Sequence, residues 1–313
     1  IKECLESLLQ QDCNFEYEIL AIDDCSTDGS LAVMQSLQSP RLKIIANKVN
    51  KGAAVSVTEA LAQCKGEYLC RFDGDDKWPA DFLRKTAAML DAHREVDIVY
   101  GDVAFIDSEG RVTSSSNNIN RREPHNPIIE NEFVDILNEY YINAPTIMFR
   151  KAAFEKAFPL PGYLIEKRNF IDWHISLMVL HQGKAYYIHE PIAYYRLHPK
   201  NNHVTIIYDL NAEHVTRYVL NYFVPSNEQI PYWRKRKIFA DNYFILAERY
   251  FGVQMFDDAK RTYKMIAQYY PPYMLKKEFL KHLVGSYLGT GGYNTIKKVL
   301  GRKTQLQNAH TAH

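Results

Sequence analysis

Short apolar runs alternate with amphipathic segments along the first hundred residues. The runs with strand character lie at residues 18–22, 42–45, 68–72 and 96–101. The helical patterns before and between them lie at residues 3–11, 30–37 and 53–63. Strands that alternate with helices at this pitch are typical of a parallel sheet covered on both faces. The pattern therefore predicts an α/β fold with a Rossmann-like, mostly parallel sheet and helices on both faces.

The pattern changes in the second half of the chain. Short strands and loops mix up to about residue 200, and Ser114 to Asn118 predicts a flexible loop on the substrate side. After about residue 205, residues 240–250 and 256–270 have amphipathic helical spacing and weakly resemble one tetratricopeptide-type hairpin. We expect a first domain at residues 1–204 and an all-helical C-terminal module at residues 205–313. Because one hairpin cannot bury its own apolar face, this module is expected to pack on the first domain, a protein partner or a membrane.

Composition excludes several classes of protein. The 313 residues carry a formal net charge of +1, which gives no overall field for binding nucleic acid. The five cysteines form no C-x-x-C pair, so a reducing, cytoplasmic compartment is expected. No apolar run approaches the roughly 18 residues that a membrane-spanning helix needs. The glycine-rich stretch 289–292 does not follow a strand, which argues against a dinucleotide oxidoreductase.

Two acidic clusters follow predicted strands. Asp23 and Asp24 end the first strand, and Asp73, Asp75 and Asp76 follow the third. Ligands of open α/β sheets bind outside the carboxyl ends of the strands, where both clusters fall. Carboxylates this close together repel one another, and a divalent cation such as Mn²⁺ or Mg²⁺ removes that penalty. The alternative for the second cluster is a water-exposed turn rich in aspartate.

Several segments resemble the inverting family 2 glycosyltransferases, which have a GT-A fold, and they occur in that family's order over most of residues 1–200. The matching segments are residues 18–30, Asn50-Lys51-Gly52, Lys65-Gly66-Glu67-Tyr68, Phe72-Asp73-Gly74-Asp75-Asp76-Lys77-Trp78-Pro79, residues 143–150, residues 170–175 and Tyr195-Arg196-Leu197-His198. The family's first strand is absent from this sequence, which begins inside a predicted helix. We expect the natural protein to carry that strand before Ile1.

The resemblance implies a role for each acidic cluster. Asp24, together with Asp23, would hydrogen-bond the nucleobase of a nucleotide-sugar donor. Asp75 and Asp76 would serve the ribose and the metal, with support from Asp73. The metal, Mn²⁺ or Mg²⁺, would neutralise the diphosphate leaving group.

The resemblance also implies a catalytic base and two donor contacts. Asp172 matches the aspartate that accepts the proton of the attacking hydroxyl, although Ile171 replaces the usual glutamate before it. Taken alone, Asp172 also fits a helix N-cap. Arg196 and His198 would contact the donor diphosphate, and His198 is also a candidate metal ligand.

The implied function is transfer of a sugar, expected from a UDP-sugar, to a saccharide or glycoconjugate during polysaccharide biosynthesis. A cytosolic enzyme at the inner face of the membrane is the expected setting. Two alternatives stay open: a non-catalytic GT-A protein that binds a nucleotide sugar, and an adaptor that acts through its helical module. Transfer from a donor panel would favour the enzyme, and loss of a partner on deletion of the module would favour the adaptor.

Overall fold

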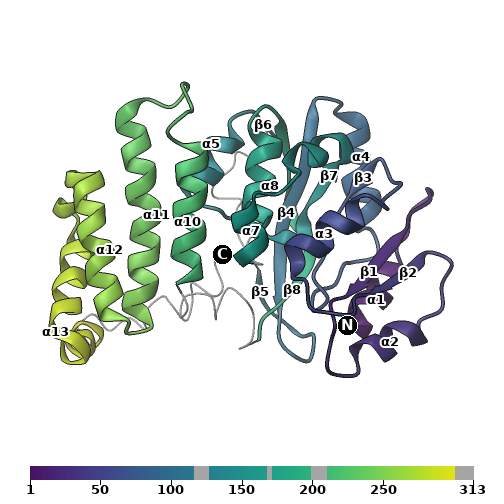
Figure 1. The fold of residues 1–313 in the computed structure, drawn as a ribbon, viewed down its shortest axis with the longest axis horizontal. Coiled ribbons are helices and arrows are strands. Elements are labelled where there is room, and N and C mark those ends of the chain that lie inside the picture. Colours follow the sequence, from purple (N-terminus) through teal and green to yellow (C-terminus); the bar gives the residue numbers. More distant parts are fainter. Residues whose placement is uncertain (116–126, 168–170, 199–209, 300–313) are drawn as a thin grey trace. The chain divides into compact units, whose positions relative to one another are not determined.

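The computed structural model describes residues 1–115, 127–167, 171–198 and 210–299, and the chain forms two compact units, both traced in Figure 1. The N-terminal unit contains Ile1–Ile136 and Tyr141–His198, and the helical unit contains Leu137–Tyr140 and the described residues after position 209. The predicted boundary at residues 204–205 and the end of the predicted loop, residues 116–118, lie outside the described residues.

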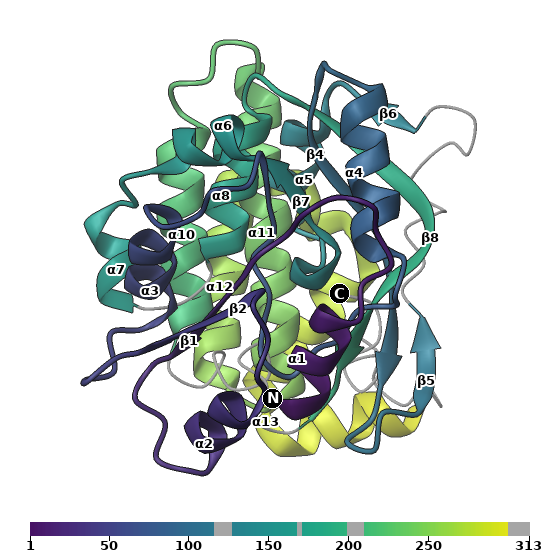
Figure 2. The same cartoon turned by 90° about the vertical axis from the view of Figure 1, so that its right-hand side faces the viewer.

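The N-terminal unit contains two sheets. The smaller one pairs β1 (Ile19–Asp23) with β2 (Leu42–Ala46). The larger one has the order β3-β7-β4-β8-β6, with β5 paired to β4. Its strands are β3 (Tyr68–Leu69), β4 (Val96–Ile106), β5 (Val112–Ser115), β6 (Ile128–Ile129), β7 (Met148–Arg150) and β8 (Lys184–Arg196). Figure 2 shows the length of β8, which curves along the sheet and pairs with β4 and β6.

The larger sheet is mixed. Parallel pairing is limited to β1–β2 and β4–β8 among the described strands, and β3–β7, β4–β7, β4–β5 and β6–β8 are antiparallel. The α/β class is thus as expected, but the expectation of a mostly parallel sheet is wrong at the level of strand pairing. The reason is that β5 follows β4 through a tight turn at Asp107–Gly110 rather than a crossover helix, and that β7 inserts between β3 and β4 in the opposite direction.

Helices cover both faces of the central strand β4, which is buried along nearly all of its length. The helices of this unit are α1 (Lys2–Leu9), α2 (Ser30–Ser36), α3 (Ala53–Leu61), α4 (Phe82–Ala92), α5 (Glu132–Asn138), α6 (Lys151–Phe154), α7 (Gly162–Lys167) and α8 (Ile171–Leu180), with short 3-10 turns η2 (Ala144–Thr146) and η3 (Glu155–Ala157). Both α4 and α8 contact β4. A Cβ atom at Gly101 of β4 would lie 2.9 Å from Ile192 of β8, so glycine permits the close approach of these strands.

The helical unit consists of α10 (Asn211–Phe223), α11 (Tyr232–Gly252), α12 (Phe256–Tyr269), the 3-10 turn η4 (Pro271–Leu275) and α13 (Lys277–Val299), which is kinked at Gly289. The predicted helices at residues 240–250 and 256–270 correspond to α11 and α12. These two helices pack together through buried small and aromatic side chains: Ala247, Tyr250, Ala259 and Tyr263. Arg261 of α12 pairs with Glu213 of α10 through two contacts of 2.6 Å, which fixes the first three helices.

Candidate active site

The acidic segment after β3 is held against the end of β8. Lys77 and Tyr194 exchange two backbone hydrogen bonds of 3.2 and 2.9 Å. Beside them, the buried indole of Trp78 stacks on Phe82 with ring centroids 3.9 Å apart. Its Nε1 donates to the carbonyl of Pro145 at 2.7 Å. The residues just before Lys77, which include Asp75 and Asp76, are therefore fixed beside the residues just after Tyr194.

This pairing joins two sequence motifs that are 120 residues apart. The backbone N–H of Arg196 donates to Oδ1 of Asp76 at 2.8 Å. Nε2 of His198 lies 3.0 Å from Oδ2 of Asp75. The structure thus brings together four of the residues singled out from the sequence.

Asp76 is buried with little compensation for its charge. The residue is only 2% exposed, and burial, followed by the charge of Asp75, raises the pKa of Asp76 to about 8. The hydrogen bond from Arg196 lowers the pKa but does not offset these effects. A carboxylate in this condition favours either a bound proton or a bound cation.

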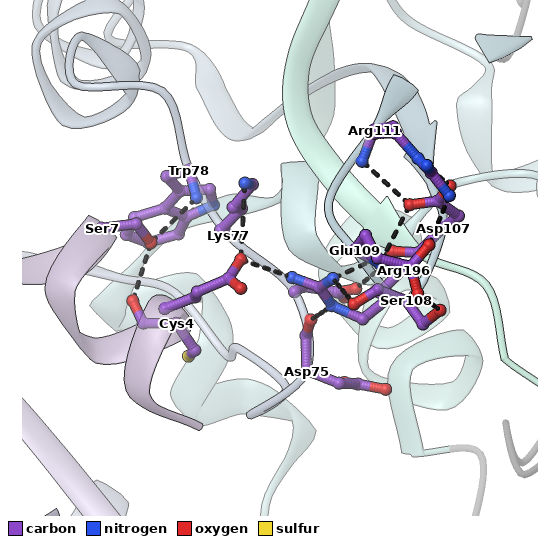
Figure 3. Close-up of polar contacts among 12 residues, drawn as sticks. Cys4, Ser7, Asp75, Lys77, Trp78, Asp107, Ser108, Glu109, Arg111 and Arg196 are labelled. Atoms are coloured by element: carbon purple, nitrogen blue, oxygen red, sulfur yellow. Dashed lines mark hydrogen bonds and ion pairs between the residues drawn. The ribbon is translucent and has the colours of Figure 1, made fainter. Parts of the chain in front are cut away.

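The Arg196 guanidinium connects four segments of the chain (Figure 3). Its Nε donates to the carbonyl of Asp75 at 2.8 Å, and Nη1 donates to the carbonyls of Asp107 and Ser108. Its Nη2 lies 2.9 Å from a carboxylate oxygen of Glu3 in α1. These contacts fix the acidic segment between α1 and the β4–β5 turn.

Asp172 is linked to the acidic segment by Arg71, a residue that the sequence analysis missed. Nη1 of Arg71 lies 3.0 Å from both carboxylate oxygens of Asp172, which is in the first turn of α8. Nη2 of the same guanidinium lies 2.6 Å from Oδ1 of Asp73. Burial raises the pKa of Asp172, and the Arg71 charge acts against that rise. The sequence signal for this contact was Arg71 itself, a charged residue inside the apolar run 68–72. A partly buried arginine needs an acidic partner.

Both motifs lie near one partly buried phenol, that of Tyr195. Tyr195 is located between Tyr194 and Arg196 near the end of β8. Burial, followed by the charges of four carboxylates, raises the pKa of Tyr195. Those carboxylates belong to Asp76, Asp73, Asp75 and Asp172. The predicted base and the predicted metal segment are therefore close enough to act on the same group.

The Asp24 carboxylate is occupied by hydrogen bonds from its own unit. The backbone N–H groups of Lys51 and Gly52 donate to it at 2.9 and 2.7 Å, and Asn47 Nδ2 donates at 2.9 Å. Burial raises the pKa of Asp24, but these bonds outweigh the effect and lower it. Gly52 has a φ of 82°, a left-handed conformation that favours glycine and turns its N–H toward Asp24.

Asp23 differs from its neighbour. Its Oδ2 accepts a hydrogen bond from the Ser26 N–H at 3.2 Å, while its Oδ1 is buried and has no hydrogen-bond partner within the described part of the chain. An unpaired buried acceptor is costly, so a ligand that donates a hydrogen bond there would stabilise the site.

The side chains around Asp75 and Asp76 suit a cation whose remaining ligands come from a substrate. Among the described residues, no group of three or more histidine, cysteine, aspartate or glutamate side chains is arranged to hold a metal ion alone. Asp75, Asp76 and the adjacent His198 supply hard oxygen ligands and one imidazole. Mg²⁺ and Mn²⁺ sites that act on phosphates commonly use one or two carboxylates and complete the shell with phosphate oxygens and water. The residues present fit that arrangement.

Solved structures share this fold. The chain is similar to S. aureus TarS 1–349, solved in complex with UDP, with a TM-score of 0.58 and 17% identity over 96% of this chain and 88% of that chain. It is also similar to the mannosyltransferase PcManGT from Pyrobaculum calidifontis, solved with GDP-Man and Mn²⁺, with a TM-score of 0.53 and 14% identity over 96% of this chain and 82% of that one. The α/β GT-A fold and the helical C-terminal region are confirmed.

Sequence relatives agree with the fold. The putative glycosyltransferase EpsE of Bacillus subtilis (strain 168) is 35% identical over 113 residues, which is 35% of this chain and 40% of EpsE. This chain therefore matches less than half of the length of that relative. The model of the family described as "Glycosyl transferase family 2" matches residues 1–158, which is half of the chain. By the extent of that match, the chain belongs to glycosyl transferase family 2.

Proposed function

We propose that this chain is a glycosyltransferase that uses Mn²⁺ or Mg²⁺ to transfer a sugar from a nucleoside diphosphate sugar, a UDP-sugar by preference, to a hydroxyl of a saccharide or glycoconjugate with inversion. Two neighbours of similar fold support a nucleoside diphosphate donor, since they were solved with UDP and with GDP-Man and Mn²⁺. Polysaccharide assembly is the proposed process.

The observation that carries this proposal is the Arg71 bridge between Asp172 and Asp73. The bridge ties a carboxylate at the start of α8 to the segment that would hold the metal and the diphosphate. An inverting reaction needs this arrangement, because the base must act on the acceptor hydroxyl while the leaving group departs on the opposite side.

In this proposal Asp172 accepts the proton of the acceptor hydroxyl as that oxygen attacks the anomeric carbon. Arg71 opposes the effect of burial on the pKa of Asp172 and so favours the ionised form that can accept the proton. Ile171, at the position of the family's usual glutamate, is buried and cannot orient the base by a hydrogen bond. Arg71 takes over that orienting role.

The acidic segment and β8 would bind the metal and the diphosphate. Asp75 and Asp76 are the proposed metal ligands, with His198 beside Asp75. When bound, the metal supplies positive charge that stabilises the departing diphosphate. Asp73 supports the segment through Arg71, and Arg196 holds it through its backbone and side-chain contacts.

The β1 cluster would bind the nucleobase. The unpaired Oδ1 of Asp23 fits an N–H donor of a base such as uracil. Asp24 would support that contact by fixing the turn at Lys51 and Gly52, and its exposed edge would face the base or ribose.

The test is Asp172→Asn, assayed for transfer from a panel of nucleotide sugars with Mn²⁺. We expect the rate of transfer to fall by about 10³-fold, within the range for loss of a general base. The affinity for UDP, measured by thermal shift with Mn²⁺, should stay nearly unchanged because only the proton acceptor is lost. Asp81→Asn, which alters a carboxylate at the start of α4, is the matched control.

Retained transfer by Asp172→Asn, or an equal loss of transfer and UDP binding, would contradict the role of Asp172. A wild-type chain that binds UDP but transfers from no donor in the panel would support the alternative of a non-catalytic nucleotide-sugar-binding protein.

A further inference from the structure

The outer face of α13 is apolar although it is exposed. Leu280, Val284, Tyr287 and Leu288 recur at the spacing of one helix face, and each is between 44% and 65% exposed. The opposite face of the same helix is buried through residues such as Phe279. This segment of α13, the yellow helix in Figure 1, is thus apolar on two sides, and only one side packs on its own unit.

The exposed face continues into η4. Leu275, two residues before α13 begins, is 85% exposed, and Met274 before it is also exposed. Single exposed apolar side chains are ordinary on protein surfaces, but a contiguous set on one face marks an interaction site.

Lysines lie on and beside this face. Lys277 and Lys281 are one turn apart, and by helical spacing they share the face with Val284 and Leu288. From α12, the ammonium group of Lys264 lies 5.8 Å from the ring centroid of Tyr287. Within the described part of the chain, these three lysines form no ion pair with an acidic residue. The face therefore combines apolar surface with uncompensated positive charge.

A hollow of about 490 Å³ adjoins the face between α12 and α13. Its lining includes Lys260, Lys264, Gln268 and Tyr287. Lys260 is paired with Asp257 at 2.6 Å, so Lys264 is the lysine of the hollow that remains available to an anion. Gln268 adds an exposed amide that can donate a hydrogen bond to a phosphate oxygen.

We infer that the outer face of α13 binds the surface of an anionic lipid bilayer. The apolar side chains would enter the boundary between headgroups and acyl chains, and Lys264, Lys277 and Lys281 would contact lipid phosphates. The hollow beside Tyr287 would receive one headgroup. No described helix is long and apolar enough to span a bilayer.

A second copy of the chain fits this face less well. In a two-fold symmetric contact the same surface meets itself, so two faces with the same net positive charge would be brought together. Like charges brought together in this way destabilise a contact, whereas the phosphates of an anionic bilayer attract them. The acidic residue nearest to these lysines in sequence is Glu278. Its single negative charge does not cancel the charges of the lysines, so the face keeps a net positive charge.

The test is co-sedimentation of the full chain with vesicles. Vesicles of equal parts phosphatidylglycerol and phosphatidylcholine are compared with vesicles of phosphatidylcholine alone. We expect the chain to pellet with the anionic vesicles and to be released by high salt. Val284→Asp with Leu288→Asp should lower the partition coefficient by about tenfold or more. Replacing Lys264, Lys277 and Lys281 by Gln should lower it by about 100-fold, from roughly fivefold per lysine, the equivalent of about 1 kcal/mol each.

Matched controls lie in the N-terminal unit. Val49→Asp with Val112→Asp introduces the same two charges at exposed apolar positions, and replacing Lys48, Lys65 and Arg94 by Gln removes the same positive charge. Both controls should pellet like the wild type. Thermal melting of each variant checks that the substitutions, all at solvent-accessible positions, leave the fold intact.

No pelleting of the wild type, equal pelleting with neutral vesicles, or unchanged binding by the α13 variants would overturn the inference. A wild-type dimer that the α13 substitutions split, together with no vesicle binding, would assign the face to a second copy instead. The assay contains no nucleotide sugar, so its outcome does not depend on the proposed reaction.

Discussion

The two acidic clusters of the N-terminal unit look alike in the sequence but differ in how the protein stabilises their charge. At the end of β1, Asp24 receives two backbone N–H groups and an asparagine side chain, and its pKa is lowered. After β3, Asp76 is buried, lies beside Asp75 and has a pKa raised to about 8. Asp24 is thus satisfied by the protein, whereas the buried carboxylate of Asp76 receives one hydrogen bond within the described part of the chain, from the Arg196 N–H.

The difference separates two uses of a carboxylate. A carboxylate supplied with donors can fix a loop, and Asp24 fixes the turn that contains Gly52. A buried carboxylate with few donors is unfavourable by itself, and a protein can retain it where a cation binds. Position at the end of a strand is common to both clusters, so position alone does not distinguish them.

The largest expected effect is on the second cluster. Asp76→Asn should lower the rate of Mn²⁺-dependent transfer by about 10³-fold or more, because the substitution removes a ligand charge worth several kcal/mol in the transition state. The asparagine oxygen can still accept the Arg196 N–H, so the fold should persist. Mn²⁺-dependent UDP binding, measured by calorimetry, should be lost.

Asp81→Asn, which lies outside both clusters, is the control for that experiment. This variant keeps the second cluster unchanged and should bind Mn²⁺ with UDP at the wild-type stoichiometry. Normal Mn²⁺-dependent UDP affinity in Asp76→Asn would show that the second cluster does not differ from the first by binding a cation through Asp76.

The second expected effect is a stability change of opposite sign at the two clusters. Asp24→Ala should lower the free energy of unfolding by about 3 kcal/mol, because it leaves several donors without a charged partner. In metal-free solution at pH 8, Asp76→Asn should instead raise the melting temperature, by about 2–4 °C for each kcal/mol recovered in a unit of this size. Urea titration and thermal melting measure the two changes.

The pH dependence gives the sign of the Asp76 effect. In the unfolded chain an aspartate ionises near pH 4, whereas folded Asp76 holds its proton up to about pH 8. Between these values the folded state binds more protons than the unfolded state, so the contribution of Asp76 to stability falls as pH rises. The gain in melting temperature of Asp76→Asn should therefore grow from pH 4 to pH 8. Parallel melting curves for variant and wild type across this range would contradict the predicted burial of an uncompensated charge.

The sequence predicted the elements whose signals are local. The apolar runs at residues 42–45 and 96–101 form β2 and part of β4, because each is a run of apolar residues with clear ends. The predicted strand at residues 68–72 pairs only at Tyr68 and Leu69. Beyond Leu69 the chain leaves the sheet, and the Arg71 side chain turns to Asp73 and Asp172.

The sequence could not predict features that depend on tertiary contacts. The antiparallel insertion of β7 between β3 and β4 joins segments that are far apart in the chain, and periodicity carries no information on it. The same limit applies to the site. The types of residue identify Asp75, Asp172 and His198 as candidates, but the 101-residue separation of Arg71 and Asp172 hides their contact.

The smallest expected effect concerns Arg71, the cation that links the second cluster to the proposed base. A lysine at this position presents one ammonium group and cannot replace a guanidinium that contacts two carboxylates at once. We expect Arg71→Lys to lower the rate of transfer by about tenfold. It should also move the acidic limb of the pH–rate profile to higher pH, because weaker pairing leaves burial to raise the pKa of Asp172 further. Arg41→Lys, at an exposed arginine beside Tyr17, should change neither quantity. If the acidic limb does not shift in Arg71→Lys, Arg71 fixes the segment after β3 without changing the pKa of Asp172. The second cluster would then resemble the first, in which Asp24 fixes a turn.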